Sequence, residues 1–155
     1  MSLTVTISHR AIYPAAAIVS TFWLSFWQTM KAVGARKRAG IEYPRVYAEK
    51  AEAEESKEAM IFNCTQRAAY NTIEHLPVVI TSTIITSVKY PVLAAMLCGI
   101  WSLCRFVYTI GYSTGDPLKR NIYNSGRLHT LAWLGLMCTA SAAVVHLAVD
   151  HLVVA

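Results

Sequence analysis

The stretch PVLAAMLCGIWSLCRFVYTIGY, residues 91–112, decides the class of fold to which this chain belongs. It contains a single charged residue, Arg105, and is as long as the roughly 20 residues that an α-helix needs to cross about 30 Å of hydrocarbon. A helix satisfies all of its backbone hydrogen bonds internally, so it is stable in lipid. The stretch therefore predicts a transmembrane helix.

Three further apolar runs flank this stretch, and the predicted spans cover approximately residues 11–33, 61–88, 91–113 and 125–149. The first run exceeds the 7–15 residues of a signal-peptide core, so we expect it to be a retained span. The chain is 55% hydrophobic with a mean hydropathy of +0.39, which is too apolar for an ordinary soluble domain. The sequence predicts an all-α membrane protein, a bundle of four transmembrane helices, with residues 1–155 forming one membrane domain.

Basic residues in the connections predict the orientation. The first connection contains Arg36, Lys37, Arg38, Arg45, Lys50 and Lys57. The third connection contains Lys119 and Arg120, and basic loops face the cytosol. The net charge of +5 thus reflects topology, and we expect no nucleic-acid partner. Helix-forming residues in YAEKAEAEESKEAM, residues 47–60, predict that the second helix extends into the cytosol.

Two polar stripes lie inside the predicted spans, close to their cytosolic ends. Each has spacings of three and four residues, which place its members on one helix face. The stripes consist of Arg67, Asn71 and Glu74 in FNCTQRAAYNTIEHLP (residues 62–77), and of Arg105, Tyr108 and Tyr112. Ionisable side chains in lipid cost about 2.5–3.5 kcal/mol each and usually mark a functional site.

A structural explanation competes with a functional one. Arg67 and Glu74 could neutralise each other, and Arg105 could extend towards the membrane surface. Taken with the basic helix ends, however, the stripes favour a pocket for a small polar anion. Arginine binds carboxylates through two hydrogen bonds, and Glu74 could receive an ammonium group. A tripeptide such as glutathione has these groups together with a thiol.

The segments FNCTQRAAYNTIEHLP and GYSTGDPLKR (residues 111–120) resemble signatures of the MAPEG family, membrane-associated proteins of eicosanoid and glutathione metabolism. ARKRAGIEYPRVYAE (residues 35–49) is similar to the same family, and the likeness covers roughly residues 11–149. The resemblance implies a homotrimer that binds glutathione as co-substrate at its cytosolic end, between protomers and without a metal. It implies transfer of glutathione to lipophilic electrophiles, or reduction of lipid hydroperoxides. We expect the membrane to be that of the endoplasmic reticulum, or alternatively the mitochondrial outer membrane.

The resemblance also implies roles for individual residues. With Arg105 added from its stripe, the predicted glutathione-binding residues are Arg36, Lys37, Arg67, Asn71, Glu74, Arg105, Tyr108 and Tyr112. The cation that activates the thiolate is Lys119 if the comparison continues from Tyr112 without a gap, and Arg120 if the turn at residues 115–117 shifts it. We favour Arg120, because a guanidinium stays charged in an apolar site. Tyr108 is the expected catalytic hydrogen-bond donor, with Tyr112 as the alternative.

Three departures from the leukotriene synthase branch of the family, at Lys37, Ala69 and His75, favour a general transferase or peroxidase. Two rival functions stay open. One is a non-enzymatic protein that binds and presents lipids, like the lipoxygenase-activating member of the family. The other is a structural membrane subunit whose polar stripes only hold helices together.

Residues outside the stripes receive structural interpretations. His146, Asp150 and His151 lie at the opposite end of the predicted bundle, so we expect packing or solvation there and no metal. His129 could line the pocket or lie at an interface. The tryptophans are expected to face lipid or anchor the interface: Trp23, Trp27, Trp101 and Trp133.

Overall fold

The computed structural model describes residues 9–154, and within that range it is helical without any strand. A short 3₁₀ turn, η1 (His9–Ala11), leads into α1 (Ile12–Ala39). The remaining elements are α2 (Lys50–Glu55), α3 (Lys57–Lys89), α4 (Pro91–Tyr112), η2 (Pro117–Asn124) and α5 (Ser125–Val154). The all-α prediction is confirmed.

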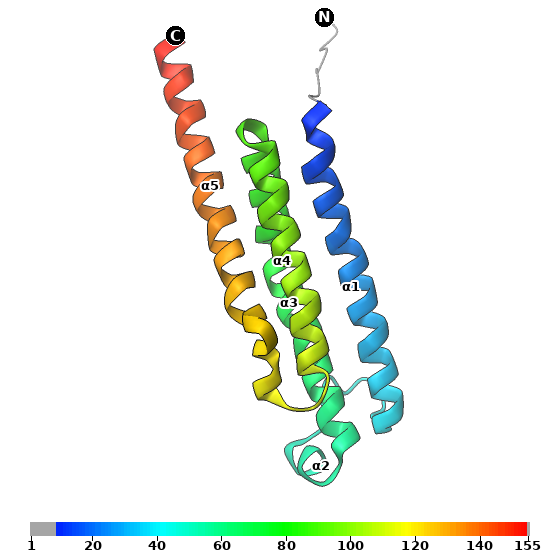
Figure 1. The fold of residues 1–155 in the computed structure, drawn as a ribbon. Coiled ribbons are helices and arrows are strands. Elements are labelled where there is room, and N and C mark those ends of the chain that lie inside the picture. The colour runs from blue at the N-terminus through cyan, green and yellow to red at the C-terminus, as the bar shows by residue number, and fades with distance from the viewer. Residues whose placement is uncertain (1–8, 155) are drawn as a thin grey trace, which may run out of the picture.

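The four long helices run side by side in an elongated molecule (Figure 1). Helices α3 and α4 pack against each other, and both contact α1 on one side and α5 on the other. Helix α1 begins and α5 ends at the same end of the molecule, while α2 lies at the opposite end (Figure 1). We call this opposite end, which also carries the loop at 40–49 and η2, the connector end.

By length and composition, two helical segments are apolar enough to cross a membrane, Pro91–Tyr112 and Pro117–Val153. The stretch that opened the sequence analysis is the first of them, and it forms α4 over the same residues. Proline at its first position fits, because the first backbone N–H of a helix has no internal partner. Membrane crossing by α1 and α3, which carry more polar residues, stays a prediction.

The central core receives side chains from all four long helices. It consists of Leu24 from α1, Val79 from α3, Cys98 and Trp101 from α4, and Ala132 and Leu136 from α5. Trp101 is fully buried, so the expectation that it faces lipid is wrong. An indole is large enough to fill the space where four helices meet, and packing decides its position here over its preference for interfaces. Trp23, by contrast, is 68% exposed.

The connection before α3 differs from the expected continuous helix over residues 47–60. Helix α2 ends at Glu55, and Ser56 is extended, with φ −118° and ψ 117°. Its hydroxyl accepts a hydrogen bond from the Ala59 backbone N–H and thereby caps α3. At the other end of α2, Arg45 pairs with Glu52, and their hydrogen bond lowers the pKa of the Glu52 carboxyl. Local capping therefore overrides the high helix propensity of this segment.

Candidate functional site

Arg67, Asn71 and Glu74 lie on one exposed face of α3 near the connector end, as their spacing predicts. Arg67 binds Glu74 through two hydrogen bonds, with N–O distances of 2.7 and 3.2 Å. Asn71 Nδ2 lies 3.5 Å from the same carboxylate. The side chains of Arg67 and Glu74 are 45% and 49% exposed, so both carry hydrogen-bonding groups open to a ligand. Tyr47, in the loop at 40–49, lies close to Arg67. Burial raises the pKa of the Tyr47 phenol, and the neighbouring Arg67 guanidinium offsets part of that rise.

Arg105 joins this α3 face to α4 from inside the protein. It is fully buried and does not extend towards the membrane surface. Its guanidinium donates to Asn71 Oδ1 at 2.8 Å, to the Ala68 carbonyl at 2.9 Å and to Thr72 Oγ1 at 2.9 and 3.1 Å. These partners engage all three of its nitrogens. The guanidinium therefore fixes the Asn71 amide, with its oxygen turned inward and its nitrogen turned towards Glu74.

Sequence reasoning missed a second layer of polar side chains behind Arg105. Gln28 of α1 is 1% exposed, and its Nε2 donates to Thr72 Oγ1 at 2.9 Å and to Thr109 Oγ1 at 2.7 Å. The three side chains thus connect α1, α3 and α4 at the depth of Arg105. A glutamine within an otherwise apolar first span was the signal, because uncharged polar groups in lipid also need internal partners.

The two tyrosines of α4 continue the chain of contacts. The Tyr108 ring lies 4.1 Å from the Arg105 guanidinium carbon, and it contacts the Tyr112 ring edge-on at 5.6 Å. His129 of α5 packs against Tyr108 with 5.5 Å between ring centroids, and its Nδ1 lies 2.9 Å from the Ser125 carbonyl. His129, whose role the sequence left open, is buried beside the tyrosines. These contacts join six of the predicted site residues into one connected cluster: Arg67, Asn71, Glu74, Arg105, Tyr108 and Tyr112.

Lys119 and Arg120 lie in η2, which folds back against the end of α4. A Cβ on Gly111 would collide with the Lys119 carbonyl, so the absence of a side chain at Gly111 lets η2 approach α4. Gly115, with φ +85°, provides the turn between them. The Lys119 ammonium lies 4.0 Å from the Asp116 carboxylate. Arg120, the next residue of η2, is exposed.

Replacing Gly111 with alanine tests this close approach. We expect Gly111→Ala to lower the free energy of unfolding by about 1–3 kcal/mol, because the added methyl group must displace the η2 backbone at Lys119. Gly99→Ala on the same helix is the matched control, since a Cβ there meets no atom within 4 Å. The free energy of unfolding of the Gly99→Ala control should equal that of the wild type or exceed it by up to about 1 kcal/mol. Thermal unfolding in detergent gives both values, and equal midpoints would contradict the close approach.

Arg36 lies apart from the cluster, in a cavity of about 230 Å³ between α1 and α3. Its guanidinium donates to the Arg45 carbonyl at 2.6 Å and lies between the rings of Tyr43 and Phe62, at 4.3 and 4.7 Å. Lys37 is exposed at the same end of α1. Within residues 9–154 of a single chain, Arg36 and the α3 cluster share no hydrogen-bond partner.

Two of the three residues that were interpreted as structural at the opposite end, His146 and Asp150, have internal partners. Tyr90 Oη lies 2.7 Å from His146 Nδ1, and Lys89 forms an ion pair with Asp150 at 3.0 Å. These contacts fasten α5 to the junction of α3 and α4. They agree with the packing role expected for His146 and Asp150.

Comparison with known proteins relates this arrangement to a family. The MAPEG family matches residues 13–143, which include all four long helices over most of their length. The match contains the α3 cluster, the two tyrosines and the η2 cations. This chain belongs to the MAPEG family.

Proposed function

We propose that this protein is a membrane glutathione transferase with glutathione-dependent peroxidase activity, similar to microsomal glutathione S-transferase 3. The MAPEG family includes glutathione transferases, peroxidases and lipid-metabolising proteins, some of which are not enzymes. The observation that carries the proposal is the connected cluster of Arg67, Asn71, Glu74, Arg105, Tyr108 and Tyr112 beside Lys119 and Arg120.

The exposed part of this cluster suits the charged ends of glutathione. The Arg67 guanidinium can donate two parallel hydrogen bonds to a ligand carboxylate, which would displace Glu74. Glu74 released from Arg67 can then receive the ligand ammonium. The Asn71 amide is held in one orientation by Arg105, so it adds a hydrogen bond without first losing side-chain freedom. Lys37 and Arg36 are proposed to hold a further carboxylate.

We further propose that the protein assembles as a homotrimer, with glutathione held between protomers. Arg36 and Lys37 of α1 would form one half-site and the α3 cluster the other, and their separation within one chain supports a site shared between copies. The α3 cluster is exposed, and Arg36 lies in a different cavity of the same chain. A neighbouring copy that presents its α1 end to the α3 cluster would join the two half-sites. We place the assembly in the endoplasmic reticulum, or alternatively in the mitochondrial outer membrane. Its four helices would span the bilayer, with the connector end in the cytosol.

The chemistry requires only a thiolate and a positioned acceptor. A free thiol has a pKa of about 8.5, and a nearby cation with hydrogen-bond donors lowers that value. We assign Arg120, or Lys119, as the cation and Tyr108 as a hydrogen-bond donor to the sulfur. The thiolate attacks an electrophilic carbon, a carbon–sulfur bond forms, and the leaving group departs with its electron pair.

With a lipid hydroperoxide, the thiolate attacks the terminal oxygen instead. The oxygen–oxygen bond breaks, the lipid leaves as an alcohol after taking a proton, and glutathione becomes a sulfenic acid. A second glutathione thiol reduces the sulfenic acid, giving glutathione disulfide and water.

The test is addition of glutathione to the purified, detergent-solubilised protein at neutral pH. We expect a saturable rise in thiolate absorbance, and no rise with S-methylglutathione, which has no ionisable thiol. Isothermal titration on the same sample measures binding independently. Binding without a thiolate signal would favour the lipid-presenting alternative, and absence of binding would leave the polar cluster a purely structural element.

A further inference from the structure

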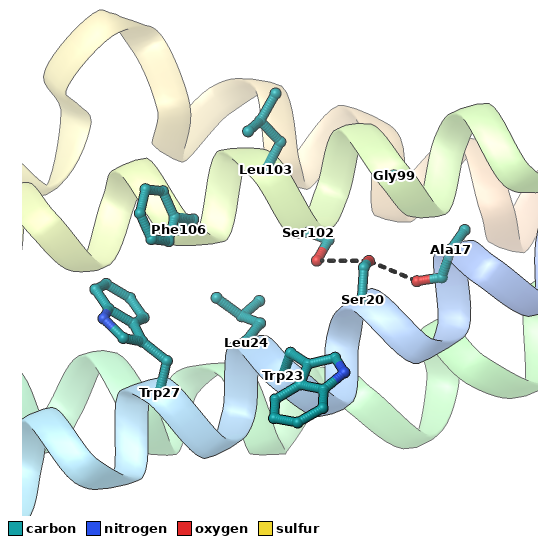
Figure 2. Close-up of a pocket in the computed structure, with 9 residues that line it drawn as sticks. All are labelled: Ala17, Ser20, Trp23, Leu24, Trp27, Gly99, Ser102, Leu103 and Phe106. Atoms are coloured by element: carbon teal, nitrogen blue, oxygen red, sulfur yellow. Dashed lines mark hydrogen bonds between the residues drawn. The ribbon is translucent and has the colours of Figure 1, made fainter.

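A second candidate site lies on the opposite side of α4 from the tyrosines, in a groove between α1 and α4 (Figure 2). The groove has a volume of about 530 Å³, within the ~300–1,000 Å³ typical of small-molecule sites. On α1 it extends from Ala17 to Trp27, which at 1.5 Å per residue is about 15 Å. That length equals half of the ~30 Å hydrocarbon core, or the depth of one lipid leaflet.

The walls of the groove are mainly apolar. Trp23, Leu24 and Leu103 provide apolar sides, and Gly99 leaves open space where another residue would place a side chain. Ser20 and Ser102 meet across the groove at 3.1 Å, and Ser20 also lies 2.6 Å from the Ala17 carbonyl (Figure 2). The two hydroxyls satisfy each other and that carbonyl. A ligand in the groove therefore needs no polar group at the level of these two serines.

One end of the groove carries a positive charge. Trp27 and Phe106 face each other there, with 4.6 Å between ring centroids (Figure 2). One turn further along α1, the Lys31 ammonium lies 5.7 Å from the Trp27 ring centroid. Within residues 9–154, no carboxylate lies within ion-pair distance of Lys31. An ammonium at an apolar groove's end attracts the acidic head of an amphiphile.

We propose that the α1–α4 groove binds a long-chain fatty acid, with its alkyl chain along Trp23, Leu24 and Leu103 and its carboxylate at Lys31. A single apolar groove that ends near a single cation matches an amphiphile with one alkyl chain and one negative charge. The site is separate from the proposed glutathione site, because Phe106 faces α1 whereas Tyr108 packs against His129 of α5. The proposal therefore stands whether or not the protein activates glutathione.

The experiment uses the tryptophans as reporters. The full-length protein is placed in phosphatidylcholine nanodiscs and titrated with dibromostearic acid, whose bromines quench nearby indole fluorescence. Because Trp23 and Trp27 line the groove, we expect saturable quenching by the acid and much weaker quenching by its methyl ester. Gly99→Leu fills the open space and should abolish the saturable component, whereas Gly99→Ala should retain it.

Lys31→Gln should weaken the apparent affinity for the acid about fivefold, because one basic residue at a membrane surface contributes about that factor. This variant keeps the groove intact, so it tests the proposal even if Gly99→Leu fails to fold. Two results would overturn the proposal. One is non-saturable quenching that is equal in wild type and Gly99→Leu. The other is equal saturable quenching by brominated phosphatidylcholine with no effect of Lys31→Gln, which would indicate ordinary lipid contact.

Discussion

Arg105→Ala is expected to lower the free energy of unfolding by about 3–5 kcal/mol. The substitution removes every hydrogen bond made by a fully buried guanidinium. Asn71 Oδ1 loses its donor. Thr72, by contrast, keeps the hydrogen bond from Gln28, and the Ala68 carbonyl keeps the one from Thr72. A polar group left unsatisfied costs about 1–3 kcal/mol, and the cavity left by the long side chain adds to the loss. The measurement is unfolding of the detergent-solubilised protein, followed by circular dichroism.

Two further variants separate the stability role of Arg105 from its positioning role. Arg105→Met fills much of the volume and removes the buried charge, so we expect it to be more stable than Arg105→Ala. Both variants release the Asn71 amide, and both should therefore weaken glutathione binding. Arg38→Ala is the control, because its ion pair with Glu58 is exposed and should contribute at most about 1 kcal/mol.

The binding readout decides between the two roles. If Arg105→Met binds glutathione as tightly as wild type, Arg105 contributes only to packing and does not position Asn71. If Arg105→Ala unfolds no more easily than Arg38→Ala, the buried network does not stabilise the helices.

Helical spacing was sufficient to predict which residues share a face. Arg67, Asn71 and Glu74 lie on one side of α3 because residues three and four apart are neighbours in any α-helix. The apolar stretch at 91–112 predicted α4 for the same reason, since periodicity and length are local properties. Local patterns therefore defined the helices and the exposed half of the candidate site.

Spacing could not predict which face of α4 turns inward. Arg105 was expected among the ligand-binding residues, yet its guanidinium is enclosed by α3 and backed by Gln28 of α1. Such enclosure depends on contacts between segments far apart in the sequence. The same reason explains Trp101, which packs in the core instead of facing lipid. The direct ligand contact expected of Arg105 stays a prediction, and the geometry supports a positioning role.

The break between α2 and α3 has a more local cause. Helix propensity summed over residues 47–60 favours one helix, but Ser56 caps α3 and Arg45 ties Glu52 back to the preceding loop. Serine is a good capping residue and a mediocre helix former, so its position carried information that composition alone did not.

Arg120→Ala is expected to slow glutathione conjugation roughly 100–1,000-fold at neutral pH, because it removes a fixed positive charge from beside the reacting sulfur. The structure gives a reason to prefer Arg120 over Lys119. The Lys119 ammonium lies 4.0 Å from the Asp116 carboxylate, whereas Arg120 has no ion pair within residues 9–154. We therefore expect Lys119→Ala to have a much smaller effect, and it serves as the matched control.

The pH profile distinguishes loss of the cation from damage to the fold. A cation that lowers the pKa of the bound thiol is needed most below the ordinary thiol pKa of about 8.5. The Arg120→Ala rate should therefore rise towards the wild-type rate as the pH increases through that value, and Arg120→Lys should restore part of the activity at neutral pH. A deficit that is independent of pH would assign Arg120 a structural role. A larger effect of Lys119→Ala would transfer the catalytic assignment to Lys119, and two small effects would mean that neither cation holds the thiolate.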